Sequence, residues 1–414
     1  MGDLAARVTS LGGLFLMLAL ALAFGENRRR ISLRLVLAGL GLQLLFAVLV
    51  LRTAPGRAFF EGAKHAFDFL LAASDEGAAF LFGKLVTDLD IRAVVAFKVL
   101  PIVIFVSAVA GVLYHLGVTQ WVVRLMARVM QKAMNTSGAE SLACALFVFL
   151  GIEATTAITE YIRRMTRSEL FTLMTGFMAT IAGSVMGAYT YFVGKENSGH
   201  LLAASVMSAP AAIVIAKMMI PETEEPLTRG HVAFTPPRES VNLIDAAARG
   251  AGQGLLLALN IGAMLIAFVG LVALVNLLLG AATGPFLADG AEPLTLQRFF
   301  GYAFSPLALA MGVPWEDALR VGQLLGTKTV LNEFLAYEQM KGLIAQGALS
   351  PRSIVIATYA LCGFANFGSV AILIGGLGSI DPGRKGLIAR LGLRAIVSGT
   401  LAAFMTACFA GILV

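Results

Sequence analysis

Two stretches, LFVFLGIEATTAITEYI at 146–162 and KTVLNEFLAYEQM at 328–340, each place acidic side chains inside a broken apolar run. The informative residues are Glu153 in the first stretch and Glu333, which follows Asn332, in the second. A carboxylate at bilayer depth costs about 2.5–3.5 kcal/mol on insertion scales, so such a residue usually faces protein or water and handles a substrate, an ion or a proton. Two of them, in two halves of one chain, predict a transport site.

The rest of the chain has the composition of a membrane protein. Of its 414 residues, 58% are hydrophobic and 14% are charged, whereas soluble domains carry about 25% charged residues. The sequence therefore predicts a polytopic membrane protein. The net charge of +6 comes from Lys and Arg in short connections, as in cytoplasmic loops, and does not indicate a nucleic-acid partner. The three cysteines lie in apolar runs without metal or disulfide spacing, which predicts core packing.

Apolar runs mark the helices of the first third of the chain. Runs at 9–24 and 33–51 flank a basic cluster at 28–34, which predicts a helical hairpin with a cytoplasmic turn. The first run has no strongly basic start and no clear cleavage site, so we interpret it as a retained helix. Charges at helical spacing over 56–72 favour an amphipathic interfacial helix, with a connecting loop as the alternative. Further runs lie at 94–118 and, amphipathic, at 121–134.

The pattern changes near residue 142. Two short apolar pieces flank Gly151-Ile152-Glu153, and neither reaches the roughly 20 residues that a bilayer requires. They predict a re-entrant helical hairpin with its tip near Gly151. Broken pieces at 297–313 and 317–340 predict a second hairpin, punctuated by Gly312, Pro314 and Gly326. The remaining apolar runs are 170–192, 200–220, 252–280, 352–378 and 391–413, and 221–240 is the one long polar loop.

A weak internal repeat connects the two halves. Arg167-Ser168 is followed by Gly183-Ser184-Val185, and Arg352-Ser353 is followed at the same spacing by Gly368-Ser369-Val370. Each copy comes after a candidate hairpin. Secondary transporters often consist of inverted repeats whose broken helices meet at the midplane and bind substrate and ion there. Broken backbone at that depth is tolerated only where it is buried in protein or lines a cavity.

A second polar group lies in CGFANFGS at 362–369. Asn366 and Ser369 are three residues apart, so we expect them to share one helix face. Together with Glu333 they offer carboxylate, amide and hydroxyl groups, which can donate to and accept from the vicinal hydroxyls of a sugar. Phe364 could cover an apolar ring face. The alternative is a purely structural clamp in which the polar side chains hold two helices together.

With these residues the sequence resembles the concentrative nucleoside transporter family over almost its full length. The matching text is EGAAFLFGKL (76–85), FKVLPIVIFVSAVAGVLYHLGV (97–118), AESLA (139–143), MTRSELF (165–171), PETEEP (221–226), LNIGAMLIAFVGLVALVN (259–276), GVPWEDAL (312–319), TKTVLNEFLAY (327–337) and CGFANFGS (362–369). Several of these motifs are long and occur in order, unlike the chance similarity of two hydrophobic chains.

The resemblance implies an all-α homotrimer in the lipid bilayer. Each protomer would have eight transmembrane helices and two opposed re-entrant hairpins, with an inverted-repeat transport domain that moves like an elevator against a trimerisation scaffold. The implied layout is 1–54 N-terminal scaffold helices, 55–92 interfacial helix region, 93–135 scaffold helix and amphipathic helix, 136–220 first hairpin and following transport-domain helices, 221–245 polar loop, 246–290 scaffold helix, and 291–414 second hairpin and C-terminal helices.

The same resemblance assigns the substrate site unevenly. Glu333, Asn366 and Ser369 match the ribose-binding residues, so the sugar half looks intact. The first hairpin of the family usually reads Gly-Gln-Thr/Ser-Glu, whereas this chain has Leu150-Gly151-Ile152-Glu153. Glu153 keeps the acid, but two side chains that would contact the nucleobase are lost, at about 1–3 kcal/mol for each unpaired polar edge. The expected substrate-binding residues are Glu153, Val185, Glu333, Phe364, Asn366 and Ser369.

The sodium site implied by the resemblance is also altered. Leu146 stands where the family has an asparagine, and Thr180 where it has a serine, while Phe149 belongs to the same hairpin. Sodium prefers oxygen ligands, and a leucine side chain has none. We therefore expect Thr180 and Phe149 to form at most a weak sodium site, and a proton carried by Glu153 or Glu333 is the alternative coupling ion.

The expected function is cation-coupled secondary uptake of a nucleoside or ribosyl analogue across a cell inner membrane, without an organic cofactor. The alternative is a binding or gate-like membrane protein of the same fold that does not transport. No catalytic triad, zinc-binding HExxH motif or phosphate loop occurs in the sequence, so we do not expect an enzyme.

Overall fold

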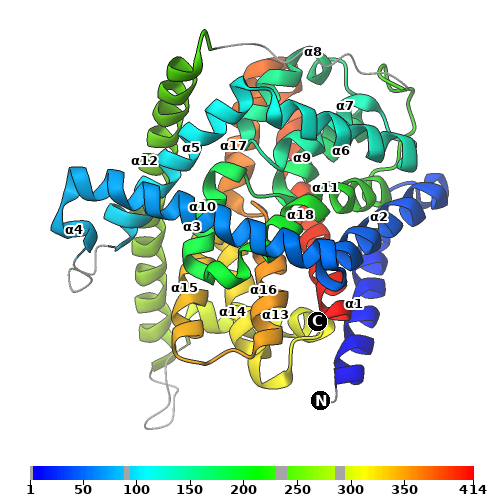
Figure 1. Cartoon of the computed structure of the whole chain (residues 1–414). Coiled ribbons are helices and arrows are strands. Elements are labelled where there is room, and N and C mark those ends of the chain that lie inside the picture. The colour runs from blue at the N-terminus through cyan, green and yellow to red at the C-terminus, as the bar shows by residue number, and fades with distance from the viewer. Residues whose placement is uncertain (1–2, 88–93, 230–239, 285–293) are drawn as a thin grey trace.

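The computed structural model describes residues 3–87, 94–229, 240–284 and 294–414, apart from the side chains of Asp3, Thr87 and Thr156. Every regular element in these ranges is a helix (Figure 1), which confirms the predicted all-α class. The N-terminal elements are α1 (Asp3–Ala23), α2 (Leu33–Arg52), α3 (Ala54–Phe82), the short α4 (Lys84–Thr87), a π-helical turn (Val95–Val99), α5 (Leu100–His115) and α6 (Val118–Met134).

The predicted interfacial helix at 56–72 forms the first part of α3, which continues to Phe82. Thr53 starts it by accepting a hydrogen bond from the backbone N–H of Gly56 at 3.1 Å, the usual role of an N-cap. The buried residues of α3, among them Ala63, Phe67 and Leu71, recur every three or four positions, so one stripe faces the protein. The helix is therefore amphipathic, as its charges predicted.

Two halves follow, and each contains a helical hairpin, a broken helix and a long unbroken helix, while the second half begins with two further helices. The first half has α7 (Gly138–Phe147), a 3-10 segment (Ile152–Ile158), α8 (Thr159–Ile162), α9 (Arg167–Ala179), α10 (Gly183–Val193) and α11 (Ser198–Met219). The second half has α12 (Leu243–Thr283), α13 (Leu296–Ala310), α14 (Trp315–Val330), α15 (Glu333–Ala345), α16 (Pro351–Leu361), α17 (Phe367–Ile380) and α18 (Lys385–Leu413).

The internal repeat coincides with two broken helices. Arg167 begins α9 and Gly183 begins α10, while the equivalent Arg352 and Gly368 lie in the first turns of α16 and α17. Two runs that the sequence shows as continuous, 170–192 and 352–378, are thus each interrupted by a short extended segment. The hairpins that precede these broken helices lie at opposite ends of the molecule, α7 and α8 at the top and α14 and α15 in the lower half (Figure 1).

The second hairpin is displaced from its predicted position. It consists of α14 and α15 and turns at Leu331-Asn332, whereas α13 is a separate helix that packs along α14. The punctuation residues explain the error. Pro314 is the N-cap of α14, and Gly326 lies inside α14, where a side chain would meet Phe300 at 2.1 Å. Gly326 thus permits close helix packing and does not break the helix.

Seven helices or helix pairs within the described ranges are long and apolar enough to cross a membrane. They begin at Leu4, Leu33, Val95, Arg167, Lys195, Leu243 and Pro382. The eighth expected crossing falls on α16 and α17, which are separated by the break at Cys362–Asn366 and are individually too short. The chain is a membrane protein with several apolar helices, as its composition predicted.

The helices pack in two groups. α1 and α2 lie against α11 and α18, while α5 and α12 pack mainly on each other. The predicted layout places α1 and α2 in the scaffold, but they contact the helices that it places in the transport domain. The predicted boundaries at 92–93 and 290–291, and part of the 221–245 loop, lie outside the described residues.

Glu26, in the turn between α1 and α2, reinforces the first group. Its Oε1 accepts a hydrogen bond from Arg167 Nη2 at 2.9 Å, and Arg394 of α18 pairs with the same carboxylate. The Arg167 hydrogen bond is the main reason that the pKa of Glu26 falls to about 2. Because this pKa is depressed from 4.5, the stabilisation is present above that pH and is lost only as the pH falls toward 2. The contact therefore persists throughout the physiological range.

Small residues allow α5 and α12 to approach closely. A Cβ on Gly250 of α12 would lie 2.4 Å from the carbonyl oxygen of Ser107, and one on Gly254 would lie 2.8 Å from the Cα of Ile104. Both glycines face the partner helix, whereas Gly252 has no atom within 4 Å of its Cβ position. Spacing of small residues by four positions is typical of close helix pairs in membranes.

Gly250→Ala is expected to push α5 and α12 apart, because the new methyl group meets backbone that cannot rotate away. Overpacking of this kind costs about 1–3 kcal/mol, so the melting temperature of the detergent-solubilised protein should fall by several degrees. Gly252→Ala adds the same group in open space and is the matched control. Equal melting temperatures for the two variants would contradict the proposed packing.

Candidate functional site

Glu333 lies at the tip of the second hairpin and is 5% exposed. Its Oε1 accepts a hydrogen bond from Tyr189 Oη at 2.8 Å, and its Oε2 accepts one from Asn366 Nδ2 at 3.1 Å. Tyr189 belongs to α10 and Asn366 begins α17, so one carboxylate joins the hairpin to both broken helices. Since Glu333 is the first residue of α15, the positive end of that helix dipole also favours its negative charge.

Asn366 is a helix cap and not, as its spacing predicted, a residue on the same helix face as Ser369. Its Oδ1 accepts a hydrogen bond from the backbone N–H of Ser369 at 2.8 Å. This bond leaves the Nδ2 group to point at Glu333, so the orientation of the amide is determined on both sides. The structure brings Glu333, Asn366 and Ser369 together, and all three are buried.

Three residues of this cluster were not predicted from the sequence. Tyr189 and Tyr337 stack with ring centroids 4.8 Å apart, and the Tyr337 hydroxyl donates to the carbonyl of Thr358 at 2.8 Å. Lys328 is 1% exposed and donates to the carbonyl of Ala360 at 2.8 Å. The signal that could have identified them is a polar side chain at bilayer depth, the same signal that identified Glu333.

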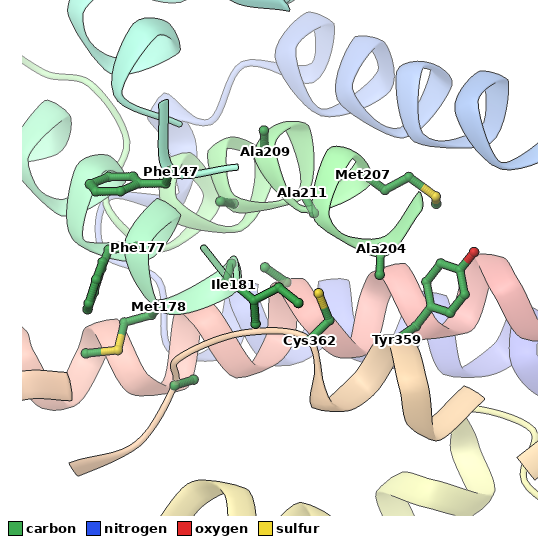
Figure 2. Close-up of a cluster of buried hydrophobic side chains, with 14 of the residues drawn as sticks. Phe147, Phe177, Met178, Ile181, Ala204, Met207, Ala209, Ala211, Tyr359 and Cys362 are labelled. Atoms are coloured by element: carbon green, nitrogen blue, oxygen red, sulfur yellow. The ribbon is translucent and has the colours of Figure 1, made fainter. Parts of the chain in front are cut away.

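The segment between α16 and α17 packs against the segment between α9 and α10. Figure 2 shows Ile181, from the first break, beside Cys362, from the second. Phe364 is half-buried, and its ring centroid lies 5.5 Å from that of Phe177, which in turn lies 5.7 Å from that of Phe147 in the first hairpin. The predicted aromatic cover is thus part of a row of rings between the two halves.

Glu153 lies in a different environment from Glu333. It is exposed and lines a cavity of about 290 Å³, which the tip of the first hairpin and Ser184 share with α5, α6 and α12. Among the described residues that line this cavity, Glu333, Asn366 and Ser369 do not occur. The structure therefore places the two predicted carboxylates in different surroundings, one buried and one exposed on a cavity. Val185, the residue after Ser184 in the first turn of α10, is buried.

Gly151 and Glu153 are coupled at the hairpin tip. A Cβ on Gly151 would lie 2.8 Å from Glu153 Oε2, so the carboxylate folds back over the space that a side chain at 151 would occupy. Ile152 packs on α17, where its Cγ1 would lie 2.9 Å from a Cβ on Gly376. The carboxylate of Glu153 thus occupies the space beside Gly151 where a larger residue would place its side chain.

The residues of the expected sodium site lie where the first hairpin meets the α9–α10 break. The carbonyl of Phe149 accepts a hydrogen bond from the backbone N–H of Gly183 at 3.2 Å. Thr180 Oγ1 lies 2.8 Å from Ser208 Oγ, and the side chain of Leu146 is fully buried. The available ligands are hydroxyl and backbone oxygens, which suit a hard monovalent cation. Within the described ranges, no group of three His, Cys, Asp or Glu residues could hold a metal ion.

Comparison with known proteins identifies the family. A family model described as "Na+ dependent nucleoside transporter C-terminus" matches residues 200–411, its N-terminal counterpart matches residues 12–85, and one described as "Nucleoside recognition" matches residues 96–196. The chain belongs to the Na+-dependent, concentrative nucleoside transporter family. The members of this family are transporters and not enzymes.

Relatives in this family span bacteria and mammals. The chain is 43% identical over 404 residues to the uncharacterized transporter YutK of Bacillus subtilis, covering 97% of this chain and 98% of YutK. It is 39% identical over 425 residues to sodium/nucleoside cotransporter 1 of Rattus norvegicus, a match that covers 98% of this chain but 64% of the rat protein. The chain therefore spans about two thirds of that mammalian relative.

Solved transporters of the family share the whole fold. The structure of CNTnw in an inward-facing substrate-bound state superimposes with a TM-score of 0.90 at 38% identity, covering 99% of this chain and 98% of CNTnw. A CNTnw variant in an outward-facing state also gives a TM-score of 0.90 at 38% identity, covering 98% of this chain and 97% of the variant. The match confirms the transporter fold for the whole described chain.

Tyr189→Phe is expected to disturb the site more than Tyr337→Phe, although both remove one hydroxyl from the same stacked pair. The first substitution removes a hydrogen bond to a carboxylate, worth about 1.5–3 kcal/mol, and the second removes one to a neutral carbonyl, worth about 0.5–1.5 kcal/mol. Nucleoside-dependent shifts in melting temperature should shrink strongly for Tyr189→Phe only. Equal losses of the nucleoside-dependent shift in both variants would show that the hydrogen bond from Tyr189 to Glu333 contributes no more to binding than the hydrogen bond from Tyr337 to Thr358.

Proposed function

We propose that this protein imports nucleosides, or a close ribosyl analogue, across the inner membrane by cation-coupled secondary transport. The observation that carries the proposal is the buried carboxylate of Glu333, held at a hairpin tip by Tyr189 and Asn366. Family membership supports a nucleoside as substrate and sodium as the coupling ion. Burial of a charged carboxylate costs several kcal/mol, and an apolar side chain of similar size would stabilise the fold as well or better. Stability alone therefore does not explain the buried position of Glu333.

Glu333, Asn366 and Ser369 would recognise the ribose. Each hydroxyl of a ribose donates and accepts, and the three side chains supply a carboxylate acceptor, an amide and a hydroxyl. The carboxylate already accepts two hydrogen bonds from protein groups and, with about four lone-pair directions, can accept further ones from vicinal hydroxyls. Phe364 and Val185 would contact the apolar faces of the ligand.

The nucleobase would meet a remodelled first hairpin. Gly151 and Ile152 have no hydrogen-bonding side chains, and Glu153 folds toward Gly151. The polar recognition of the base in this chain would therefore come from a single carboxylate, which accepts but does not donate when ionised. A base edge rich in N–H donors would suit this arrangement better than one rich in carbonyl oxygens.

Sodium coupling would be weakened, and a proton carried by Glu153 or Glu333 would take its place. Leu146 supplies no oxygen ligand from its side chain, and Thr180 shares its hydroxyl with Ser208. Glu153 lines a cavity, whereas Glu333 is buried beside Tyr189 and Asn366, and a proton on either carboxylate would serve as the alternative coupling ion. An asparagine-to-leucine variant of CNTnw in an intermediate state has a TM-score of 0.91 to this chain at 39% identity, so such a change is compatible with the fold.

Transport would proceed by an elevator-like movement in a homotrimer. α5 and α12 pack mainly on each other, and α12 exposes most of its length, which fits a stationary scaffold that faces lipid and neighbouring protomers. The two hairpins would be re-entrant and would move with α9, α10 and the C-terminal helices. Because α1 and α2 pack on α11 and α18, we expect them to travel with this body and not with the scaffold.

A transport-inactive binding or gate-like protein is the second candidate. It is favoured by the altered first hairpin, in which Leu146 and Gly151 replace polar residues that the family resemblance leads us to expect. The two candidates differ in saturable uptake.

Glu333→Gln distinguishes the two candidates. The substitution keeps the shape of the side chain but replaces one carboxylate oxygen with an NH2 group. This NH2 donor then faces the donor of Tyr189 or of Asn366. In proteoliposomes, the parent protein should accumulate nucleoside with saturation, and Glu333→Gln should lose at least about nine tenths of that uptake, in keeping with a charged hydrogen bond of about 1.5–3 kcal/mol. Binding without saturable uptake in the parent protein would instead identify a gate-like protein.

Leu146→Asn should strengthen the response to sodium. The amide adds one oxygen ligand beside Thr180, so sodium should raise the melting temperature of this variant more than that of the parent protein, by linkage between binding and folding. Leu142→Asn, equally buried one turn earlier on α7, is the matched control. Uptake driven separately by a sodium gradient and by a pH gradient tests the parent protein. A strong sodium response without a pH effect would exclude a proton as the coupling ion.

A further inference from the structure

Lys328 is a fully buried lysine that the ribose-binding role does not use. It lies near the end of α14, three residues before the turn of the second hairpin, and is 1% exposed. Its ammonium group donates to the carbonyl of Ala360 at 2.8 Å. A buried ammonium is expensive unless it is paired, so its position calls for an explanation.

The partner of Lys328 is the end of a broken helix. Ala360 belongs to the last turn of α16, where four carbonyls have no partner within the helix. The carbonyl of Thr358, in the same turn, accepts from the hydroxyl of Tyr337. The C-terminal end of a helix carries a partial negative charge, so the second hairpin supplies a positive charge and a hydroxyl to the place where α16 stops.

The equivalent end in the first repeat lacks such a cap. α9 stops at Ala179, and Phe177, Met178 and Ala179 are buried. Within the described part of the chain, no hydrogen bond reaches the carbonyls of the last four residues of α9. The residues of the first hairpin that lie against this end of α9 include Cys144 and Phe147, neither of which has a charged side chain. In the second repeat, the ammonium group of Lys328 thus caps the end of α16. In the first repeat, the carbonyl oxygens at the end of α9 have no hydrogen-bond donor among the described residues.

We propose that Lys328 is a tethered cation that occupies, in the second repeat, the position which the first repeat leaves for a free cation. The inference rests on the proposed transport function and extends it: only the first repeat would take a coupling ion, and Lys328 would act as a positioning residue for Glu333. The two groups flank the Leu331-Asn332 turn and interact electrostatically. Their opposite charges let the hairpin tip move through the membrane without a net charge.

The site would accept a small primary ammonium ion once the lysine side chain is removed. Lys328→Ala deletes a three-carbon chain and its ammonium group, so propylammonium has the size and charge of the missing part. The cavity would be lined by the carbonyl of Ala360, which accepts from the ammonium group in the parent protein, and by the rest of the second hairpin. A larger quaternary ion such as tetramethylammonium could neither fit the cavity nor donate a hydrogen bond.

The test compares Lys328→Ala, Lys328→Met and Lys341→Ala with the parent protein in detergent. Lys341, in α15, contacts the ring of Tyr191 at 3.8 Å and is the matched lysine of the same hairpin away from a helix end. Melting temperature should fall for Lys328→Ala, and propylammonium should restore at least half of the loss, whereas tetramethylammonium should restore none. Propylammonium should leave Lys341→Ala and the parent protein unchanged.

Nucleoside affinity provides the second measurement. Lys328→Met fills the space without a charge, so it should fold but bind nucleoside at least tenfold more weakly and show no recovery with propylammonium. If Lys328→Ala does not fold, the Lys328→Met variant alone decides: parental affinity would overturn the proposal. Equal recovery of Lys341→Ala by propylammonium would also overturn it. Because recovery of melting temperature needs no substrate, a parent protein that binds no nucleoside would refute the proposed function without deciding on the tethered cation.

Discussion

The constraint on which the structure depends is the need to satisfy broken backbone in a dry interior. Both broken helices stop and restart among buried residues, where water cannot complete their hydrogen bonds and each unsatisfied group costs several kcal/mol, on the order of 2–7. The protein meets this need with groups outside the helices concerned: Asn366 caps α17, Tyr337 and Lys328 cap α16, and the backbone carbonyl of Phe149 accepts from the first N–H of α10. The hairpins are therefore part of the solution to helix breaks.

This need is met differently in the two repeats, and the difference explains why the site is uneven. In the second repeat, charged and polar side chains complete every described contact around Glu333, which makes this half rigid. In the first repeat, no described side chain caps the end of α9, the hydroxyl of Thr180 pairs with that of Ser208, and Glu153 lines a cavity. A rigid half suits recognition of a sugar that is common to all substrates, whereas an open half suits the variable base and an exchangeable cation.

Much of this arrangement could be predicted from particular residues. The repeated Arg-Ser and Gly-Ser pairs predicted two related halves. Glu333, Asn366 and Ser369 were expected to meet because together they offer the donors and acceptors of a sugar site and match the ribose-binding residues of the family. The roles of Tyr189 and Lys328 could not be predicted, since they depend on contacts with Glu333, 144 residues away, and with Ala360, 32 residues away. The second hairpin was misplaced because Pro314 and Gly326 have the same residue types as helix breakers but serve as a cap and a packing contact.

The fixed amide of Asn366 bears on which carboxylate can change its charge. A proton on Glu333 Oε2 would face the Nδ2 donor of Asn366, and a flip of that amide would remove the acceptor that caps α17 at Ser369. A proton on Oε1 would require the hydroxyl hydrogen of Tyr189 to turn away so that its oxygen accepts, which ends the hydrogen bond to a charged carboxylate. Protonation of Glu333 thus breaks either a charged hydrogen bond or a helix cap, each worth about 1–3 kcal/mol. The charge of Glu333 is therefore tied to the start of α17 and to Tyr189 of α10, so a change in that charge would reach both broken helices.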